Sequence, residues 1–281
     1  MGGQANSRRD EIRALKARSE EDAIRWRQMK NDMRSVSRGI DPESNDPTVP
    51  TAMARALGAL FIEAKLSGSV DEPIRFLYQT VNETVHGVAD VPIACKKGCS
   101  HCCHVWVSVA APEALCIAKT VQQRGPAVIE KVRLAHEQSK EYDFDARDEH
   151  PFPCPLLDGD VCSIYSDRPK VCRLAASADA ELCARTYHNI TNEDVPAPMM
   201  YLIGRAAYAM TLSAGLKHAG LSYHAYEFNA ALYCALTTDN AERRWLDGED
   251  IFGGIHRDPQ DVLQHEQAQF LYQAAFPNSR P

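Results

Sequence analysis

The sequence predicts a mainly α-helical fold with one small β-hairpin, built around a cysteine-rich site. Three observations support this fold class. Apolar residues recur every three or four positions over most of the chain after residue 50, which is typical of helices. Prolines begin several of these segments and glycines follow them, as at helix ends. The only clear hairpin signal is Asp158-Gly159-Asp160 between two short apolar runs.

The first region, residues 1–50, is predicted to form a charged helix and a linker. The helix covers residues 8–36, and its charges of both signs are typical of a solvated face or, alternatively, of a partner-binding arm. The linker covers residues 41–50, DPESNDPTVP, because it contains three prolines among Asp, Ser and Asn.

The second region, residues 51–240, is predicted to be a helical cysteine-cluster domain. The helix at 71–88 should pack Ile74, Leu77, Tyr78 and Val81 on one side. The predicted helices, each assigned from apolar spacing or proline and glycine punctuation, are 51–66, 71–88, 112–125, 126–140, 197–218 and 223–237. The third region, residues 241–281, is expected to be an irregular C-terminal tail.

Composition restricts the class of function. The 281 residues carry a net charge of -7, with 44% hydrophobic and 25% charged residues, which is ordinary for a globular chain large enough to bury a core. The negative charge argues against nucleic acid as a partner. The opening residues contain no apolar leader, and the apolar stretch 199–216 carries Arg205 near its centre, so we expect a cytoplasmic protein without a membrane span.

Ten cysteines are the unusual feature, because in a reducing compartment clustered cysteines are metal ligands or redox thiols more often than disulfides. The run CKKGCSHCC allows two local structures. If it is helical, its four thiols share one stripe. If Gly98 breaks the helix, the short spacing still brings several sulfurs together in a loop. The four cysteines of this run are Cys95, Cys99, Cys102 and Cys103.

A second group of cysteines follows in CPLLDGDVCSIYSDRPKVCR. Cys172 comes early in a predicted helix, where the N-terminal N–H groups favour a thiolate. The predicted metal-binding core spans residues 95–185, and its candidate ligands are Cys95, Cys99, Cys102, Cys103, Cys154, Cys162, Cys172 and Cys183. Cys116 and Cys234 lie among apolar neighbours and are expected to be core residues outside this site. His101, His104 and His188 are expected to be surface or hydrogen-bonded residues, and Tyr165 to pack beside the site.

These motifs resemble the CxxCxxCC family of zinc- or iron-chelating, cysteine-cluster proteins. The resemblance lies in CKKGCSHCC followed by VWVSVAAPEA, and in the blocks CPLLDGDVCSIY and RPKVCR, over about residues 95–185. This chain has three residues, Lys96 to Gly98, between its first two cysteines, whereas the family pattern has two. The resemblance implies metal binding and assigns no substrate. One branch that resembles the family through its cysteines is associated with lysine methylation of flagellin, which implies group transfer or redox chemistry on a protein.

The predicted cofactor is an iron-sulfur cluster or zinc. Eight thiols exceed the four ligands of a structural zinc site, which indicates two zinc ions, bridging thiolates, or an iron-sulfur cluster with additional cysteines; reduced thiols without metal are the remaining alternative. The sequence lacks phosphate-loop, nucleophile-elbow and zinc-protease motifs. Two functions therefore stay open: a metal-binding protein without an assigned reaction, or an iron-sulfur enzyme that acts on a protein partner. No catalytic residue is assigned, and the oligomeric state is left open.

Overall fold

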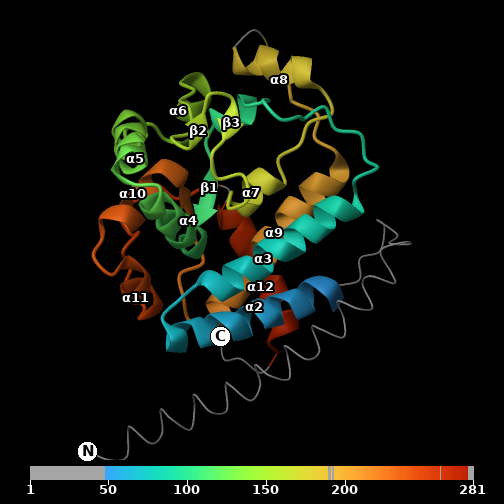
Figure 1. The fold of residues 1–281 in the computed structure, drawn as a ribbon. Helices are drawn as coiled ribbons and strands as arrows, with labels where there is room; N and C mark the ends of the chain where they lie inside the picture. The colour runs from blue at the N-terminus through green and yellow to red at the C-terminus, as the bar shows by residue number, and fades with distance from the viewer. Residues whose placement is uncertain (1–47, 189–190, 192, 260, 278–281) are drawn as a thin grey trace, which may run out of the picture.

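The computed structural model describes residues 48–188, 191, 193–259 and 261–277. The predicted N-terminal helix and nearly all of the linker lie outside these residues. Within the described residues the fold is mainly α-helical, as predicted, with two small two-stranded sheets, of which one is the predicted hairpin (Figure 1). No helix among them is long and apolar enough to cross a membrane.

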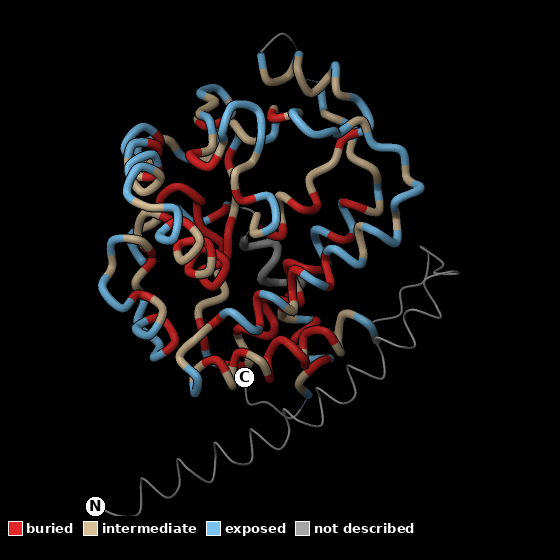
Figure 2. The backbone as a smooth tube through the Cα atoms, in the orientation of Figure 1, coloured by how far each residue is buried: buried red, intermediate tan, exposed pale blue. Residues whose placement is uncertain are grey.

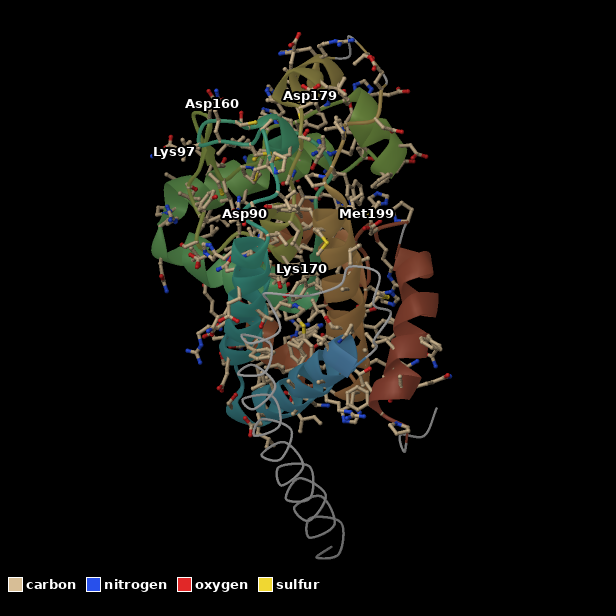
Figure 3. The ribbon with its side chains drawn as sticks, turned by 90° about the vertical axis from the view of Figure 1, so that its right-hand side faces the viewer. Asp90, Lys97, Asp160, Lys170, Asp179 and Met199 are labelled. Atoms are coloured by element: carbon tan, nitrogen blue, oxygen red, sulfur yellow. The ribbon has the colours of Figure 1, made fainter. Side chains whose placement is uncertain are left out.

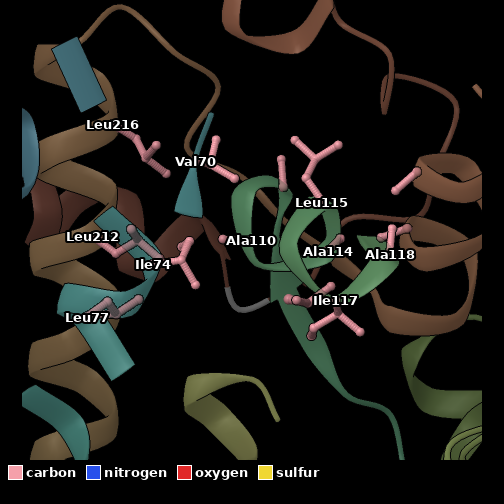
Figure 4. Packing of buried hydrophobic residues seen from close by; sticks show 14 of the residues in the cluster. Val70, Ile74, Leu77, Ala110, Ala114, Leu115, Ile117, Ala118, Leu212 and Leu216 are labelled. Atoms are coloured by element: carbon pink, nitrogen blue, oxygen red, sulfur yellow. The ribbon is translucent and has the colours of Figure 1, made fainter. Parts of the chain in front are cut away.

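Four helices form one half of the helical body. They are α2 (Thr48–Ser67), α3 (Asp71–Gly87), α9 (Met199–His218) and α12 (Asp261–Ala275). Helix α9 packs on α2, α3 and α12. The face predicted for residues 71–88 is correct, because all four of its named apolar side chains are buried. In Figure 4, Ile74 and Leu77 of α3 face Leu212 and Leu216 of α9.

The other half of the helical body contains four more helices. They are α4 (Ala111–Gln123), α5 (Pro126–Ser139), α10 (Phe228–Thr237) and α11 (Ala241–Leu246). Helix α10 packs against α4 and α5. Pro112 lies in the first turn of α4, and Gly125 precedes α5 with φ of +90°, so the predicted proline and glycine punctuation is confirmed. Buried residues from both halves belong to one hydrophobic core (Figure 2).

A short antiparallel sheet crosses the body between distant parts of the chain. Strand β1 (Ser108–Ala110) pairs with β4 (Ala225–Glu227), with Val109 opposite Tyr226. The helix predicted over 223–237 therefore begins only at Phe228. Residues 225–227 are extended because they pair with β1, and the Glu227 side chain accepts the N–H of Ala230 at 2.7 Å to cap α10.

The expectation of an irregular tail after residue 240 is wrong for residues 241–246 and 261–275, which are helical, whereas residues 247–259 between them are turns and loops. Helix α12 buries Ala268, Leu271, Tyr272 and Ala275 against α2 and α9. The Nε of Arg55 on α2 donates to the carbonyl of Ala275 at 2.7 Å. Residues 261–275 are helical because these apolar residues fall on one helix face, which the α2–α9 pair covers.

The remaining elements are short and carry most of the cysteines. They are the 3-10 helix η1 (His101–Cys103), α6 (Phe144–Glu149), β2 (Leu157–Asp158), β3 (Val161–Cys162), α7 (Lys170–Arg173) and α8 (Ala180–Tyr187). Strands β2 and β3 form the predicted hairpin, and Gly159 in its turn has φ of +57°. We call residues 94–104 and 152–188 the cysteine region.

Candidate metal centre

The first cysteine run is a loop that ends in a single 3-10 turn. Gly98 has φ of +87°, a conformation that interrupts a helix, and the N–H of Cys99 bonds the carbonyl of Lys96 at 3.0 Å. The chain then forms η1 up to Cys103. The sequence allowed two local structures, and the protein adopts the second, a loop in which Gly98 breaks the helix.

The two cysteine segments are in direct contact. The N–H of Cys154 donates to the carbonyl of Cys103 at 2.7 Å, and the N–H of Phe152 donates to the carbonyl of His104 at 3.1 Å. The Ser100 hydroxyl donates to a carboxylate oxygen of Asp160 at 2.9 Å, which joins the first run to the hairpin turn. Segments fifty residues apart in sequence thus form one structure.

Five thiols are linked by electrostatic interactions, each with at least two of the others, and we call them the inner group. They are Cys102, Cys103, Cys154, Cys162 and Cys172. Burial raises the pKa of the Cys154 thiol to about 12, and the charges of Cys162 and Cys102 add to this rise. Burial also raises the pKa of Cys172, with further contributions from Cys154 and Cys102.

The adjacent thiols of Cys102 and Cys103 form a hydrogen-bonded pair. The Cys103 thiol donates to Cys102, which lowers the pKa of Cys102 to about 7 and raises that of Cys103. The nearby guanidinium of Arg168 also favours the Cys102 thiolate. In the metal-free protein Cys102 is therefore the thiol of this pair that ionises first.

Three further thiols form an outer group next to the inner one. The Cys95 sulfur accepts the N–H of Ser177 at 3.3 Å, and the N–H of Ala94 donates to the carbonyl of Ser177 at 2.7 Å. Burial raises the pKa of Cys95, the bond from Ser177 opposes this rise, and the charges of Cys99, Cys102 and Cys183 add to it. Electrostatic interactions between thiols therefore link all eight predicted ligands.

Two cysteines lie elsewhere, as predicted. The Cys116 thiol on α4 donates to Asp71 at 3.4 Å, and burial raises its pKa. The Cys234 thiol on α10 donates to the carbonyl of Ile251 at 3.1 Å. Both side chains are partly buried against the hydrophobic core, so they provide natural controls for substitutions at the candidate site.

One sequence argument about Cys172 is wrong. A helix N-terminus was expected to stabilise its thiolate, but α7 is only four residues long and burial raises the pKa of this thiol. A single turn of helix has only a small macrodipole, whereas partial burial removes much of the water that would solvate the charge. Cys172 is therefore a protonated thiol at neutral pH until a cation offsets its charge.

The histidines surround an aromatic residue that the sequence analysis missed. The ring of Tyr187 at the end of α8 lies 4.6 Å from His104, 5.6 Å from His101 and 4.8 Å from His188. The Nδ1 of His104 is also 3.0 Å from the carbonyl of Ser100. These contacts fasten α8, and with it Cys183, to the first run.

Tyr165 does not pack beside the thiols as expected. Its side chain is 62% exposed and lies under the guanidinium of Arg168, whose carbon is 4.0 Å from the ring centroid. This cation–π contact holds Arg168 at the edge of the inner group. Other basic residues lie close to the cysteines in sequence. Of these, Lys96 and Lys97 are exposed, whereas Lys170 and Arg173 are buried.

The donor set fits a soft metal ion, because thiolates prefer zinc, copper(I) and iron-sulfur clusters. Across the described ranges, no three His, Cys, Asp or Glu side chains already stand in an arrangement that could hold an ion. All ten cysteines are free thiols. Metal binding at this site would therefore require deprotonation and local side-chain movement, which is common for thiolate sites that form together with their metal.

Comparison with known proteins supports the same chemistry. No curated protein and no solved structure matches the chain. A family model, however, matches a little more than a third of the chain, including all eight predicted ligands. The resemblance is thereby confirmed for residues 94–195, which match the CxxCxxCC family, described as a putative zinc- or iron-chelating domain.

Proposed function

We propose that this protein binds zinc or an iron-sulfur cluster through the inner group of thiols, with the outer group completing or extending the site. The observation that carries the proposal is the contact between the two cysteine segments, in which the Cys154 N–H bonds the Cys103 carbonyl. That contact brings thiols from three separate stretches of chain within electrostatic range of one another.

The negative charges that these thiols carry once they are deprotonated favour a bound cation. Cys154 and Cys172 are partly buried, which raises the pKa of both thiols, and the charge of Cys154 adds to the rise at Cys172. Several thiolates therefore cannot coexist there without positive charge. Arg168 supplies one such charge at the edge of the group. A metal ion would supply the rest, and its thiolate bonds would replace the lost solvation.

Metal affinity should depend on pH in a defined direction. The thiol of Cys154 has a pKa of about 12, so each such ligand must release a proton when metal binds at neutral pH. Affinity should therefore rise as pH rises from 6 to 8. A competition titration with a chromophoric chelator at several pH values would measure this. An affinity independent of pH would contradict ligation by protonated thiols.

Anaerobic purification tests the proposal and identifies the metal. Visible absorption with equimolar acid-labile sulfide and iron indicates an iron-sulfur cluster, whereas colourless protein with bound zinc indicates a zinc site. Protein that holds neither metal after expression with both supplied would overturn the proposal. Thiol ligands must stay reduced, so we place the protein in a reducing compartment such as the cytoplasm.

Single substitutions then locate the ligands. Cys102→Ser and Cys172→Ser should lower metal content, because each removes a thiol of the inner group. Cys116→Ser and Cys234→Ser are matched controls, since both remove a partly buried thiol that packs on the core elsewhere. Equal loss of metal in all four variants would indicate a folding defect rather than loss of a ligand.

A further inference from the structure

A four-residue helix, α7, carries Cys172 and has a buried cation at each end. Lys170 is 9% exposed and Arg173 is 5% exposed. An isolated helix of this length is not stable on its own, because nucleation costs more than one hydrogen bond returns. The position of Cys172 must therefore depend on contacts made by the residues around it.

At its first residue, α7 is fastened to the helical body by Glu113 of α4. This carboxylate is fully buried. One of its oxygens accepts the main-chain N–H of Lys170 at 2.8 Å, and the other accepts the Lys170 ammonium at 3.1 Å and the N–H of Ala110 at 3.3 Å. Figure 3 labels Lys170 toward the middle of the molecule, away from the end where Asp160 and Lys97 lie.

At its last residue, α7 is fastened by Arg173. This side chain donates to the carbonyls of Ser166 and Arg168 and to the side-chain oxygen of Asn82 on α3. Its guanidinium carbon also lies 4.0 Å from the centroid of the Tyr78 ring. Both ends of the Cys172 turn are thus tied to helices whose own positions are set by apolar packing.

From these contacts we infer that Glu113 is a positioning residue for the metal centre. It fixes Cys172 by accepting the main-chain N–H of Lys170, and its ion pair with the Lys170 ammonium at 3.1 Å gives the buried carboxylate a partner of opposite charge. The inference rests on the proposed function in one respect, that Cys172 is a ligand. Groups that orient a ligand without touching the metal typically change metal affinity by ~10–100-fold when removed.

Two double variants separate positioning from charge pairing. Glu113→Gln with Lys170→Met removes both charges but keeps an amide oxygen that can accept the main-chain N–H of residue 170. Glu113→Leu with Lys170→Met also removes that acceptor, and replacement of a buried ion pair by apolar residues of similar volume is often tolerated by the fold. The first variant should bind Co²⁺ like wild type, and the second at least ~10-fold more weakly, as measured by thiolate-to-cobalt absorption.

A matched pair elsewhere in the chain provides the control. Glu242 also accepts a main-chain N–H, that of Val70 at 2.7 Å, and a lysine ammonium, that of Lys119 at 2.8 Å. The ion pair joins α11 to α4, and the bond from Val70 joins α11 to the start of α3. All three residues lie outside the cysteine region. The variant Glu242→Leu with Lys119→Met should leave Co²⁺ affinity unchanged even if it lowers the melting temperature.

A second measurement does not depend on metal. In the metal-free protein, alkylation of Cys172 followed by mass spectrometry should be at least ~10-fold faster in the Glu113→Leu, Lys170→Met variant than in wild type, because a displaced turn exposes the thiol. Alkylation of Cys234 should not change. If Cys172 is alkylated at the wild-type rate, or if the variant binds Co²⁺ like wild type, the positioning role is refuted.

The two proposals can fail separately. Wild-type protein that binds no Co²⁺ and holds no iron-sulfur cluster after anaerobic purification would refute the metal-binding proposal, while the alkylation rates would still decide the role of Glu113. If the leucine variant does not fold, Glu113→Asp is the alternative, because it keeps the charge on a side chain one methylene shorter. Folded Glu113→Asp protein with wild-type Cys172 alkylation and Co²⁺ affinity would also refute the positioning role.

Discussion

Different interactions stabilise the helical body and the cysteine region. The helical body buries long apolar faces, such as those of Phe61 on α2 and Leu212 on α9, in one core. The cysteine region consists of loops and short elements, and its buried hydrophobic side chains are Leu156, Ile164 and Leu174. Hydrogen bonds, such as that between Cys103 and Cys154, form much of the contact between its parts.

This difference indicates which part of the protein depends on a ligand. Apolar burial stabilises by about 25 cal/mol per Å² whether or not a metal is present. A region of short elements gains little from burial, and its thiols repel one another when ionised. The helical body should therefore keep its fold without metal, whereas the cysteine region should need it.

The largest expected effect follows loss of the metal. Cys102→Ser combined with Cys172→Ser should abolish metal binding, lower the melting temperature and open residues 95–185 to protease, while helices α9 and α10 keep their helicity. Structural zinc contributes about 10–16 kcal/mol in zinc-finger peptides, as much as the net stability of a typical domain. Limited proteolysis measures the opening of residues 95–185, and circular dichroism measures the helicity that the helical body keeps. A variant without metal that melts like wild type would show that the site does not hold the fold.

A smaller effect is expected in the body from Gly215→Ala. A Cβ at this position would lie 2.8 Å from the Cβ of Leu57 and 2.9 Å from the main-chain nitrogen of Gly58, where α9 packs against α2. The overpacking should cost about 1–3 kcal/mol in denaturant unfolding and leave metal content unchanged. Gly87→Ala is the control, since nothing lies within 4 Å of its Cβ in α3. Equal stability of the two variants would mean that the α2–α9 contact has room for an added methyl group at residue 215.

The smallest expected effect comes from Ser100→Ala in the cysteine region. This substitution removes the bond to Asp160, which joins the first cysteine run to the hairpin. We expect a loss of about 0.5–1.5 kcal/mol in the metal-free protein and a smaller shift once metal is bound, because the metal would then hold the same segments. Denaturant unfolding with and without zinc measures both values. A larger loss with metal than without would contradict this division of roles.

Much of the helical body could be predicted from the sequence because its signals are local. The apolar spacing in α3 and the prolines at the starts of α4 and α5 act within one or two turns of chain. The same reasoning could have found α12, whose buried residues Ala268, Leu271, Tyr272 and Ala275 follow a three-and-four spacing, but the glutamines among them concealed it. The pairing of β1 with β4 carried no such signal, because the two strands are more than a hundred residues apart.

For the candidate site, the sequence by itself determined the donor atoms, since thiol chemistry is a property of single residues. It also offered a turn at Gly98 as one of two local structures, because glycine has access to positive φ, and the structure adopts that turn. Only the tertiary structure decided which thiols are buried together and how Cys172 is held. Glu113 reads as an ordinary acidic residue of a helix start, and its role arises from Lys170, fifty-seven residues later in the chain. Burial, and the repulsion between neighbouring thiolates that sets their pKa values, depend on which segments the folded chain brings together, and no local pattern encodes that.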